Sequence, residues 1–296
     1  MTRHKPPVNS LAALVRLTRP RQWLKNGLVG AAAVFSGTIT DPVVVIRLSL
    51  GGAALCALSG AVYALNDLHD RATDRVHPLK RDRPLASGAV SAGAAWGLAA
   101  GLVATGLTVM AFVSTGAFVT SMLYLALNAL YTLWAKEQVI LDVLTVSAGF
   151  LLRVITGGFL AGVHLSPWLL ACTFLLSLTL ALGKRRGELN ALNEEAVNHR
   201  KVMSDYSVLF LDQMIAVVGS VTITCYTLYT LLSESGRANP YLFASVIPVV
   251  YGLLRYFYLI YHRQAGESPE TLPVTDRPLL AAICVWLAIV GAALYG

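Results

Sequence analysis

Long apolar stretches, each about the length of a membrane-spanning helix, alternate along this chain with short polar segments. An α-helix that crosses a bilayer needs roughly 20 mainly apolar residues. The pattern therefore predicts an all-α integral membrane protein with nine transmembrane helices, built as a single domain over residues 1–296. The predicted spans are 24–40, 43–65, 89–113, 116–135, 139–162, 166–183, 207–233, 240–261 and 278–295.

The boundary between the first two spans follows from length. As one helix, the apolar run from Gly27 to Leu65 would be roughly 58 Å long, about twice the apolar thickness of a bilayer. The run must break, and Thr40-Asp41-Pro42 is the natural place, since proline has no backbone N–H and restricts the residue before it.

Composition and charge support this interpretation and orient the chain. Hydrophobic residues make up 56% of the sequence and charged residues 13%, about half the share usual in soluble domains. The net charge is +7, and all but four of the 23 Lys and Arg residues fall in segments on one side of the predicted spans. The positive-inside rule then predicts a multi-pass protein of the inner (plasma) membrane, with its N-terminus in the cytoplasm. Topology accounts for the basic charge, so no nucleic-acid partner is indicated.

The densest charge lies in residues 66–88, NDLHDRATDRVHPLKRDRPLASG, after the second span. Asn66, Asp70 and Asp74 are spaced so that they share one face of a helix, and Asp67 approaches the same face. Like charges at this spacing destabilise an isolated helix, so an offsetting partner is expected. Oxygen ligands of this kind suit Mg²⁺, which commonly binds through carboxylates together with substrate phosphates.

Three cations, Lys80, Arg81 and Arg83, follow within the same segment. Arginine suits bidentate phosphate contacts, and lysine acts as a compact point charge. Carboxylates for a metal beside cations for phosphate predict a site for a metal-bound diphosphate. The alternative is a solvated cytoplasmic loop with ordinary topogenic charge.

A second polar segment, 184–205, follows the sixth span and begins with GKRRGEL. Lys184 and Glu188 stand at i and i+4 and can pair along a helix, with Arg185 beside them. Taken alone, the residues favour a plain surface ion pair. Topology places this segment on the same side as 66–88, so both could face one central cavity.

Shorter segments on the same side contribute further candidates. Gln22 and Lys25 precede the first span and could hold an anionic head group, or could simply anchor the chain at the interface beside Trp23. Lys136 lies in the next such segment, and Tyr131 precedes it near the end of the fourth span. Both could line the same mouth, but the residues favour a plain interfacial tyrosine at Tyr131.

Two charged residues lie near or inside the fifth span. Asp142 is close to its polar end and could join the metal site. Arg153 is deeper, where a charge is costly and needs a cavity or a partner, and we interpret it as a structural or pocket cation.

Nine spans with NDLHDRATD and HPLKRDRPLASG after the second resemble the UbiA superfamily of membrane prenyltransferases. The resemblance implies helices in a ring around a central cavity, and Mg²⁺ on a diphosphate held by Asn66, Asp67, Asp70 and Asp74. Asn66, Asp70 and Asp74 would then be catalytic. Ordinary members carry a second motif, DxxxD, after the sixth span, whereas GKRRGEL stands here and Asp205 has no acidic partner four residues away.

The segments RPRQWLKN, KEQVILD and GKRRGEL together look like the decaprenyl-phosphate phosphoribosyltransferase branch. That branch implies transfer of 5-phosphoribose from phosphoribosyl diphosphate (PRPP) to a polyprenyl phosphate in the bilayer, for cell-wall arabinan. Lys184, Arg185 and Glu188 would then bind phosphate without a second metal. The alternatives are a prenyltransferase that moves an isoprenyl group to an aromatic or lipid acceptor, and a transporter or lipid-binding protein. A homo-oligomer is compatible with each.

Overall fold

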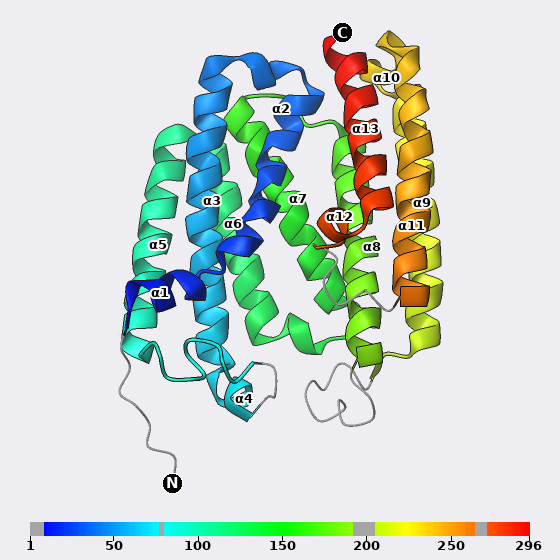
Figure 1. Ribbon diagram of the computed structural model, residues 1–296. Coiled ribbons are helices and arrows are strands. Elements are labelled where there is room, and N and C mark those ends of the chain that lie inside the picture. The colour runs from blue at the N-terminus through cyan, green and yellow to red at the C-terminus, as the bar shows by residue number, and fades with distance from the viewer. Residues whose placement is uncertain (1–8, 77–79, 192–204, 264–270) are drawn as a thin grey trace. The chain divides into compact units, whose positions relative to one another are not determined.

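The computed structural model describes residues 9–76, 80–191, 205–263 and 271–296, and every regular element in this part of the chain is a helix (Figure 1). Eight helices among these residues are long and apolar enough to cross a membrane. The predicted all-α membrane fold is confirmed. The eight are α3 (Pro42–His69), α5 (Ala92–Val113), α6 (Thr115–Leu133), α7 (Leu141–Ala161), α8 (Pro167–Ala191), α9 (Val208–Leu232), α11 (Val246–Arg263) with η6 (Pro240–Ser245) before it, and α13 (Arg277–Tyr295).

The first predicted span, 24–40, differs from the others because it is not one α-helix. It consists of most of η1 (Pro20–Gly30), an 11-residue 3₁₀-helix, then α2 (Ala31–Phe35) and η2 (Thr38–Thr40). At about 2.0 Å per residue for η1 and about 1.5 Å for α2, the two measure roughly 30 Å, the apolar thickness of a bilayer. In the described chain, the nine predicted spans thus correspond to eight long helices and this broken segment.

The predicted break at Thr40-Asp41-Pro42 is confirmed. The Asp41 carboxylate caps α3 by accepting the Val43 backbone N–H at 2.8 Å, and Pro42 occupies the first helical position. Proline is favoured there because its missing N–H would have no partner within the helix. The turn sends α3 back alongside η1 (Figure 1).

The chain divides into two compact units, each described by itself. Unit 1 comprises Met1–Ala135 and Leu152–His164, and unit 2 comprises Lys136–Leu151 and Leu165–Gly296. The boundary falls within α7. The expectation of a single domain over 1–296 stays a prediction.

In unit 1, α3 packs along α5 and against η1. Leu55 and Leu58 of α3, Met110 of α5 and Leu160 of α7 lie in its largest buried cluster. At Gly157 of α7 the backbones are in close contact, because a Cβ there would stand 2.0 Å from the Val29 carbonyl oxygen of η1. Glycine is required at this crossing, and it fixes η1 against the rest of the unit.

The short elements of unit 1 frame its polar end. They are α1 (Leu11–Leu17) and α4 (Arg71–Val76). Leu17 and Leu85 are fully buried against α3 and α5 in a second apolar cluster. This packing holds the segments before η1 and after α4 beside the end of α3.

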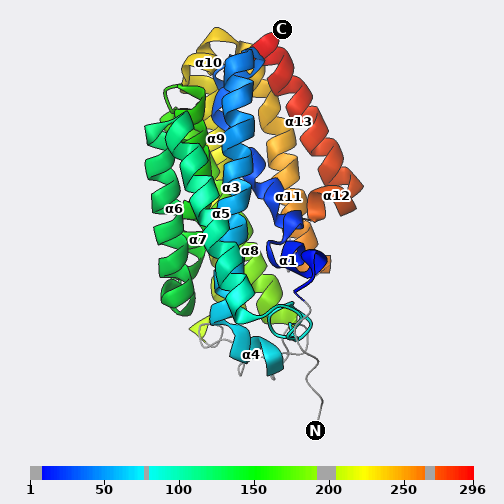
Figure 2. The ribbon, with the colours of Figure 1, turned by 90° about the vertical axis from the view of Figure 1, so that its left-hand side faces the viewer.

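In unit 2, α8 packs along α9, and α13 runs alongside α11 (Figure 2). The packing between α8 and α11 is close at Gly183, where a Cβ would lie 2.3 Å from the Tyr256 hydroxyl. The shorter elements of this unit are η3 (Ala135–Glu137, whose first residue belongs to unit 1), α10 (Glu234–Ala238) and α12 (Leu272–Thr275).

Candidate active site

The acidic motif of unit 1 begins inside α3, which continues beyond the predicted span end at residue 65. Asp70 is the C-cap of α3, and α4 starts at the next residue. Across this junction the backbone N–H of Asp70 donates to Asn66 O, and that of Asp74 to Asp70 O, both at 2.9 Å. Helical spacing is therefore kept from Asn66 to Asp74, as the sequence predicts.

Asp67 and Asp74, two turns apart, are the motif's buried carboxylates, with side chains 3% and 5% exposed. Arg83 bridges them, donating from Nη1 to Asp67 Oδ1 at 3.1 Å and to Asp74 Oδ2 at 2.7 Å. Arg19 donates to the same Asp67 oxygen at 2.5 Å, and its guanidinium lies 5.0 Å from the centre of the Tyr63 ring. Two arginines thus balance two buried carboxylates, and we name Arg19, Asp67, Asp74 and Arg83 the acidic cluster.

The other motif residues lie beside this cluster. Asn66 Oδ1 is buried and accepts no hydrogen bond, whereas Asp70 is half-buried. Of the predicted cations after the motif, Arg83 contacts both buried carboxylates, Lys80 is half-buried and Arg81 is exposed. Residues 77–79 of the segment lie outside the described residues.

The oxygen donors of this segment fit Mg²⁺ by chemical type. A buried amide oxygen without a hydrogen-bond donor is costly, and a hard cation would satisfy it. Asn66 Oδ1 is such an atom, and the carboxylates of Asp70 and Asp74 belong to the same segment. Among the described residues, however, no three His, Cys, Asp or Glu side chains already stand together as a metal site.

A polar cavity of about 260 Å³ adjoins the acidic cluster. Its basic lining suits an anion, because arginine donates several N–H groups to phosphate oxygens at once. Arg19 lies in RPRQWLKN, but the sequence predicted no part for it in this site. The lining residues are Arg16, Arg19, Asp67, Asp82, Arg83 and Pro84.

Unit 2 holds a second charged cluster around Asp142, which is fully buried at the start of α7. Its carboxylate accepts the Arg185 Nε–H at 2.5 Å and the Tyr206 hydroxyl at 2.6 Å. Arg185 also pairs with Glu188, the carboxylate that the sequence spacing allows Lys184 to reach. We name Asp142, Arg185, Glu188 and Tyr206 the basic cluster, because its central residue, Arg185, belongs to the basic sequence KRR at 184–186.

Tyr206 joins the basic cluster to the backbone before α7. Its oxygen accepts the Ile140 N–H at 2.8 Å while its hydroxyl donates to Asp142. Burial, and next the hydrogen bond to the Asp142 carboxylate, raise the pKa of Tyr206 above its usual value. The phenol therefore stays neutral and able to donate. No sequence motif indicated Tyr206.

Arg186 faces a different partner from its neighbour Arg185. It is buried, donates to Asp212 Oδ1 at 2.5 Å and to the Ile260 carbonyl at 3.1 Å, and lies 4.7 Å from the Tyr261 ring centre. Successive helical residues point about 100° apart, so adjacent arginines cannot face the same group. Arg186 fastens α8 to α9 and α11.

Arg153 lies in the apolar part of α7 and has polar partners within unit 1. Its Nε donates to Asn26 Oδ1 at 2.9 Å and its Nη2 to the Tyr124 hydroxyl at 3.0 Å. Asn26 in turn donates to Ser59 at 3.0 Å. This network joins α7, η1, α6 and α3, which favours the structural interpretation of Arg153.

The remaining predicted residues are placed as follows. Gln22 and Lys25 are half-buried on η1, one and two 3₁₀ turns after Arg19 and therefore on the same row, because residues three apart eclipse in such a helix. Asp205 is exposed, and residues 192–204 of the predicted segment lie outside the described residues. Tyr131 and Lys184 are half-buried, and Lys136 is buried. That these side chains share one cavity stays a prediction.

Apolar helices of membrane length, with buried carboxylates and arginines at their polar ends, define a multi-pass membrane protein equipped to bind an anionic ligand. The UbiA prenyltransferase family profile matches residues 27–274. The chain belongs to this family of membrane transferases, which confirms the resemblance seen in the sequence.

Curated relatives cover nearly the whole chain. The decaprenyl-phosphate phosphoribosyltransferase of Mycolicibacterium smegmatis is 33% identical over 98% of this chain and 95% of the relative. The enzyme of the same name from Corynebacterium glutamicum is 29% identical over 99% of this chain and 90% of its own length. A solved UbiA homolog from Archaeoglobus fulgidus, bound to DMAPP and Mg²⁺, has a TM-score of 0.74 at 19% identity, covering 95% of this chain and 99% of that one. The likeness in structure shows the fold.

Proposed function

We propose that this protein transfers 5-phosphoribose from PRPP to a polyprenyl phosphate such as decaprenyl phosphate, with release of diphosphate. The observation that carries the proposal is the basic cluster. Where ordinary family members are expected to carry a second acidic motif, Arg185 is buried between Asp142 and Glu188. The likeness to decaprenyl-phosphate phosphoribosyltransferases over almost the whole chain supports the same conclusion.

We assign the diphosphate of PRPP to the acidic cluster and its cavity. Asn66, Asp70 and Asp74 would hold Mg²⁺, which when bound neutralises charge on the leaving diphosphate. Arg19 and Arg83 border the cavity and would donate N–H groups to the phosphate oxygens. Such fixed donors stabilise developing charge without reorganising during the reaction.

In the proposed reaction, the bond from ribose C1 to the diphosphate oxygen breaks and its electron pair leaves with diphosphate. A phosphate oxygen of the lipid forms the new bond to C1, with inversion. A phosphate ester is already ionised near neutral pH, so no general base is required. Lys25, half-buried on η1, would steer this phosphate, since an ammonium acts as a compact point charge.

The basic cluster would contact a second phosphate of the substrate without a metal. Arg185 lies between two carboxylates, the buried Asp142 and the half-buried Glu188, which hold it in one orientation. Lys184, next to it, is half-buried and adds positive charge. Arginine and lysine together would offer N–H donors to a phosphate, so a second carboxylate motif would not be needed to hold it.

The second candidate, transfer of an isoprenyl group, is favoured by family membership and by the fold shared with the Archaeoglobus protein that binds DMAPP. Purified protein should be incubated with labelled PRPP and polyprenyl phosphate, and separately with labelled isoprenyl diphosphate and an aromatic acceptor. We expect labelled lipid only in the first reaction. Product only in the second would overturn the proposal, and magnesium-dependent diphosphate release in either would exclude a simple transporter.

We place the protein in the inner membrane with both clusters on the cytoplasmic side, where PRPP is available, and its product in the supply of cell-wall arabinan. The bias of Lys and Arg toward one side supports this orientation. A cysteine introduced at exposed Arg81 should react with an impermeant maleimide only in inverted membrane vesicles. Reaction in right-side-out vesicles alone would reverse the orientation.

A further inference from the structure

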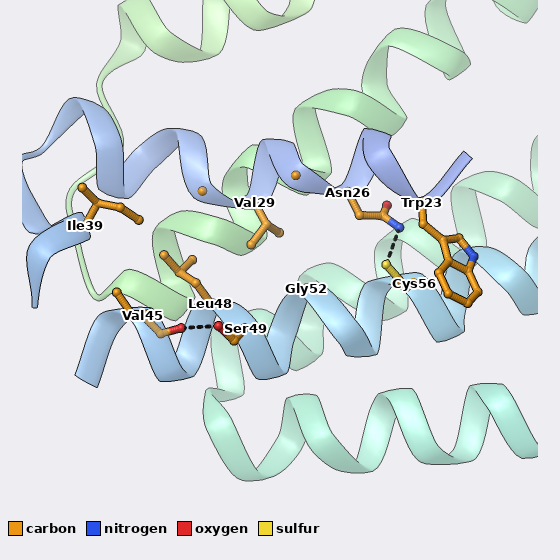
Figure 3. Close-up of a pocket in the computed structure, with 11 residues that line it drawn as sticks. Trp23, Asn26, Val29, Ile39, Val45, Leu48, Ser49, Gly52 and Cys56 are labelled. Carbon is orange, nitrogen blue, oxygen red and sulfur yellow. Dashed lines mark hydrogen bonds between the residues drawn. The ribbon is translucent and has the colours of Figure 1, made fainter. Parts of the chain in front are cut away.

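A second cavity in unit 1, of about 300 Å³, lies between η1 and α3 (Figure 3). Along α3 it extends from Val45 to Cys56, roughly 16 Å or half the apolar thickness of a bilayer. Val45, at one end, is 42% exposed, so the cavity opens to the protein surface. We name it the η1–α3 groove. Side chains that line it include Trp23, Asn26 and Val29 of η1 and Leu48, Ser49 and Cys56 of α3.

The polar side chains of the groove are satisfied by the protein itself. Asn26 accepts from Arg153 and donates to Ser59. Ser49 donates to the Val45 carbonyl at 2.7 Å, and the Trp23 indole N–H to the Thr18 carbonyl at 3.1 Å. Because these groups need no further partner, the groove favours an apolar occupant over water or a polar ligand.

Three glycines keep the groove open. A Cβ built at Gly27, Gly30 or Gly52 has no atom of the protein within 4 Å. These glycines are therefore not required for close packing of η1 on α3. Gly157, by contrast, is required for close packing of η1 on α7. The space beside them would accept methyl branches of a chain lying in the groove.

Two cations of η1, Arg21 and Lys25, flank Trp23 at one end of the groove without lining it. In a 3₁₀-helix, residues three apart lie on one row, so Arg21 shares a row with the groove residues Gly27 and Gly30. Arg21 is exposed and Lys25 half-buried. Trp23, between them in the sequence, lines this end of the groove. Tryptophan is common at membrane interfaces. An apolar groove with cations at one end matches a lipid with one anionic head.

We propose that the η1–α3 groove binds the isoprene units nearest the phosphate of the polyprenyl phosphate acceptor, with the phosphate at the Arg21 and Lys25 end. This proposal rests on the proposed function and names where its lipid substrate lies. A cavity of about 150 Å³ holds a six-carbon benzene molecule. Twice that volume therefore accommodates about two five-carbon isoprene units.

The test fills the groove at Gly52. Gly52→Leu places a side chain in open space, so it causes no clash within the protein. Leucine is also a better helix former than glycine, so the variant should fold. We expect the KM for decaprenyl phosphate to rise roughly tenfold, in line with a misfit of a few carbons in an apolar pocket. The KM for PRPP should stay unchanged, and Gly52→Ala should have an intermediate effect. Gly101→Leu on α5 is the matched control, because a Cβ there also meets nothing within 4 Å.

A binding measurement separates this inference from the proposed function. Decaprenyl phosphate with a photoactivatable diazirine on its second isoprene unit should cross-link to peptides of η1 and α3 in the wild type and much less in Gly52→Leu. Cross-links elsewhere, or kinetics of Gly52→Leu equal to those of Gly101→Leu, would overturn the proposal. The groove would then be assigned to ordinary membrane lipid. A changed oligomeric state with an unchanged KM would assign it to a second copy of the chain. Absence of phosphoribosyl transfer in the wild type would refute the proposed function, while cross-linking still decides the groove.

Discussion

Burial decides how much the two Asp–Arg pairs at the end of α8 contribute to stability. In both pairs, Arg185 with Asp142 and Arg186 with Asp212, the arginine Nε lies 2.5 Å from a carboxylate oxygen. The Asp142 side chain is 0% exposed, whereas that of Asp212 is 33% exposed. Adjacent arginines of one helix therefore offer a matched comparison of a buried pair with a partly solvated pair.

Asp142→Asn keeps the side-chain shape but removes the fully buried one of the two carboxylates that balance Arg185. The new amide can accept from either Arg185 or Tyr206 but not serve both as the carboxylate does. Breaking a buried pair costs about 3–5 kcal/mol. Asp212→Asn should cost about 0–1 kcal/mol, since the Asp212 carboxylate is already partly solvated and Arg186 keeps the Ile260 carbonyl and the Tyr261 ring as partners.

The difference is measurable by thermal unfolding of the purified protein in one detergent. A loss of about 3 kcal/mol corresponds to a midpoint lowered by roughly 6–12 °C for a unit of about 150 residues. Asp212→Asn should lie within about 3 °C of the wild type on the same scale. Equal shifts for the two variants, or a larger one for Asp212→Asn, would refute the reasoning that burial sets the contribution.

Three further outcomes are expected. Asp70→Ala should lower kcat about 100-fold or more, since loss of even an outer-shell partner of a metal ligand costs about 10–100-fold. The unfolding midpoint should stay within a few degrees of the wild type. Near-normal turnover in Mg²⁺ would exclude Asp70 as a ligand. Gly157→Ala should destabilise the protein by about 1–3 kcal/mol, because its Cβ would stand 2.0 Å from the Val29 carbonyl oxygen, and an unchanged unfolding midpoint would contradict this close contact. The hydrogen bond from Arg255 lowers the pKa of Asp276, so its contribution to stability is present above about pH 3.9 and lost as pH falls through the lowered pKa. Asp276→Asn should therefore show a weaker loss of stability on acidification, and an identical pH profile would argue against the linkage.

The sequence predicted which segments carry the site but not how their charges pair. Periodicity correctly kept Asn66, Asp70 and Asp74 on helical spacing through the junction of α3 and α4. The carboxylates that Arg83 joins are nevertheless those of Asp67 and Asp74. Helical spacing alone allows several pairs of these residues to approach. The choice depends on Arg19, which tertiary packing brings from another segment, and on Arg83, which the chain brings back from later in the same segment.

A similar limit applies to the first predicted span. Its length and apolar composition were enough to predict a crossing, but hydropathy cannot distinguish a 3₁₀-helix from an α-helix. Gly27 and Gly30 weaken an α-helix by about 1 kcal/mol each relative to alanine. Tertiary contacts then decide the conformation: Arg153 binds Asn26, and Gly157 lets the η1 backbone lie directly on α7. These partners lie too far along the chain for a local pattern to reveal.

Two residues with a strained, left-handed backbone stand next to the two clusters. Only three non-glycine residues of the described chain have positive φ, and two of them, Arg19 at +51° and Ile140 at +71°, adjoin the acidic and basic clusters. Left-handed backbone at such residues costs about 1–3 kcal/mol each, most of all at a β-branched residue, and persists only where surrounding contacts impose it. The Arg19 side chain is held by Asp67, and the Ile140 backbone N–H donates to the Tyr206 hydroxyl, itself held by Asp142. The buried carboxylates are therefore partners of the segments at the start of η1 and α7, so loss of either charge should disturb the position of the neighbouring candidate residues as well as their electrostatics.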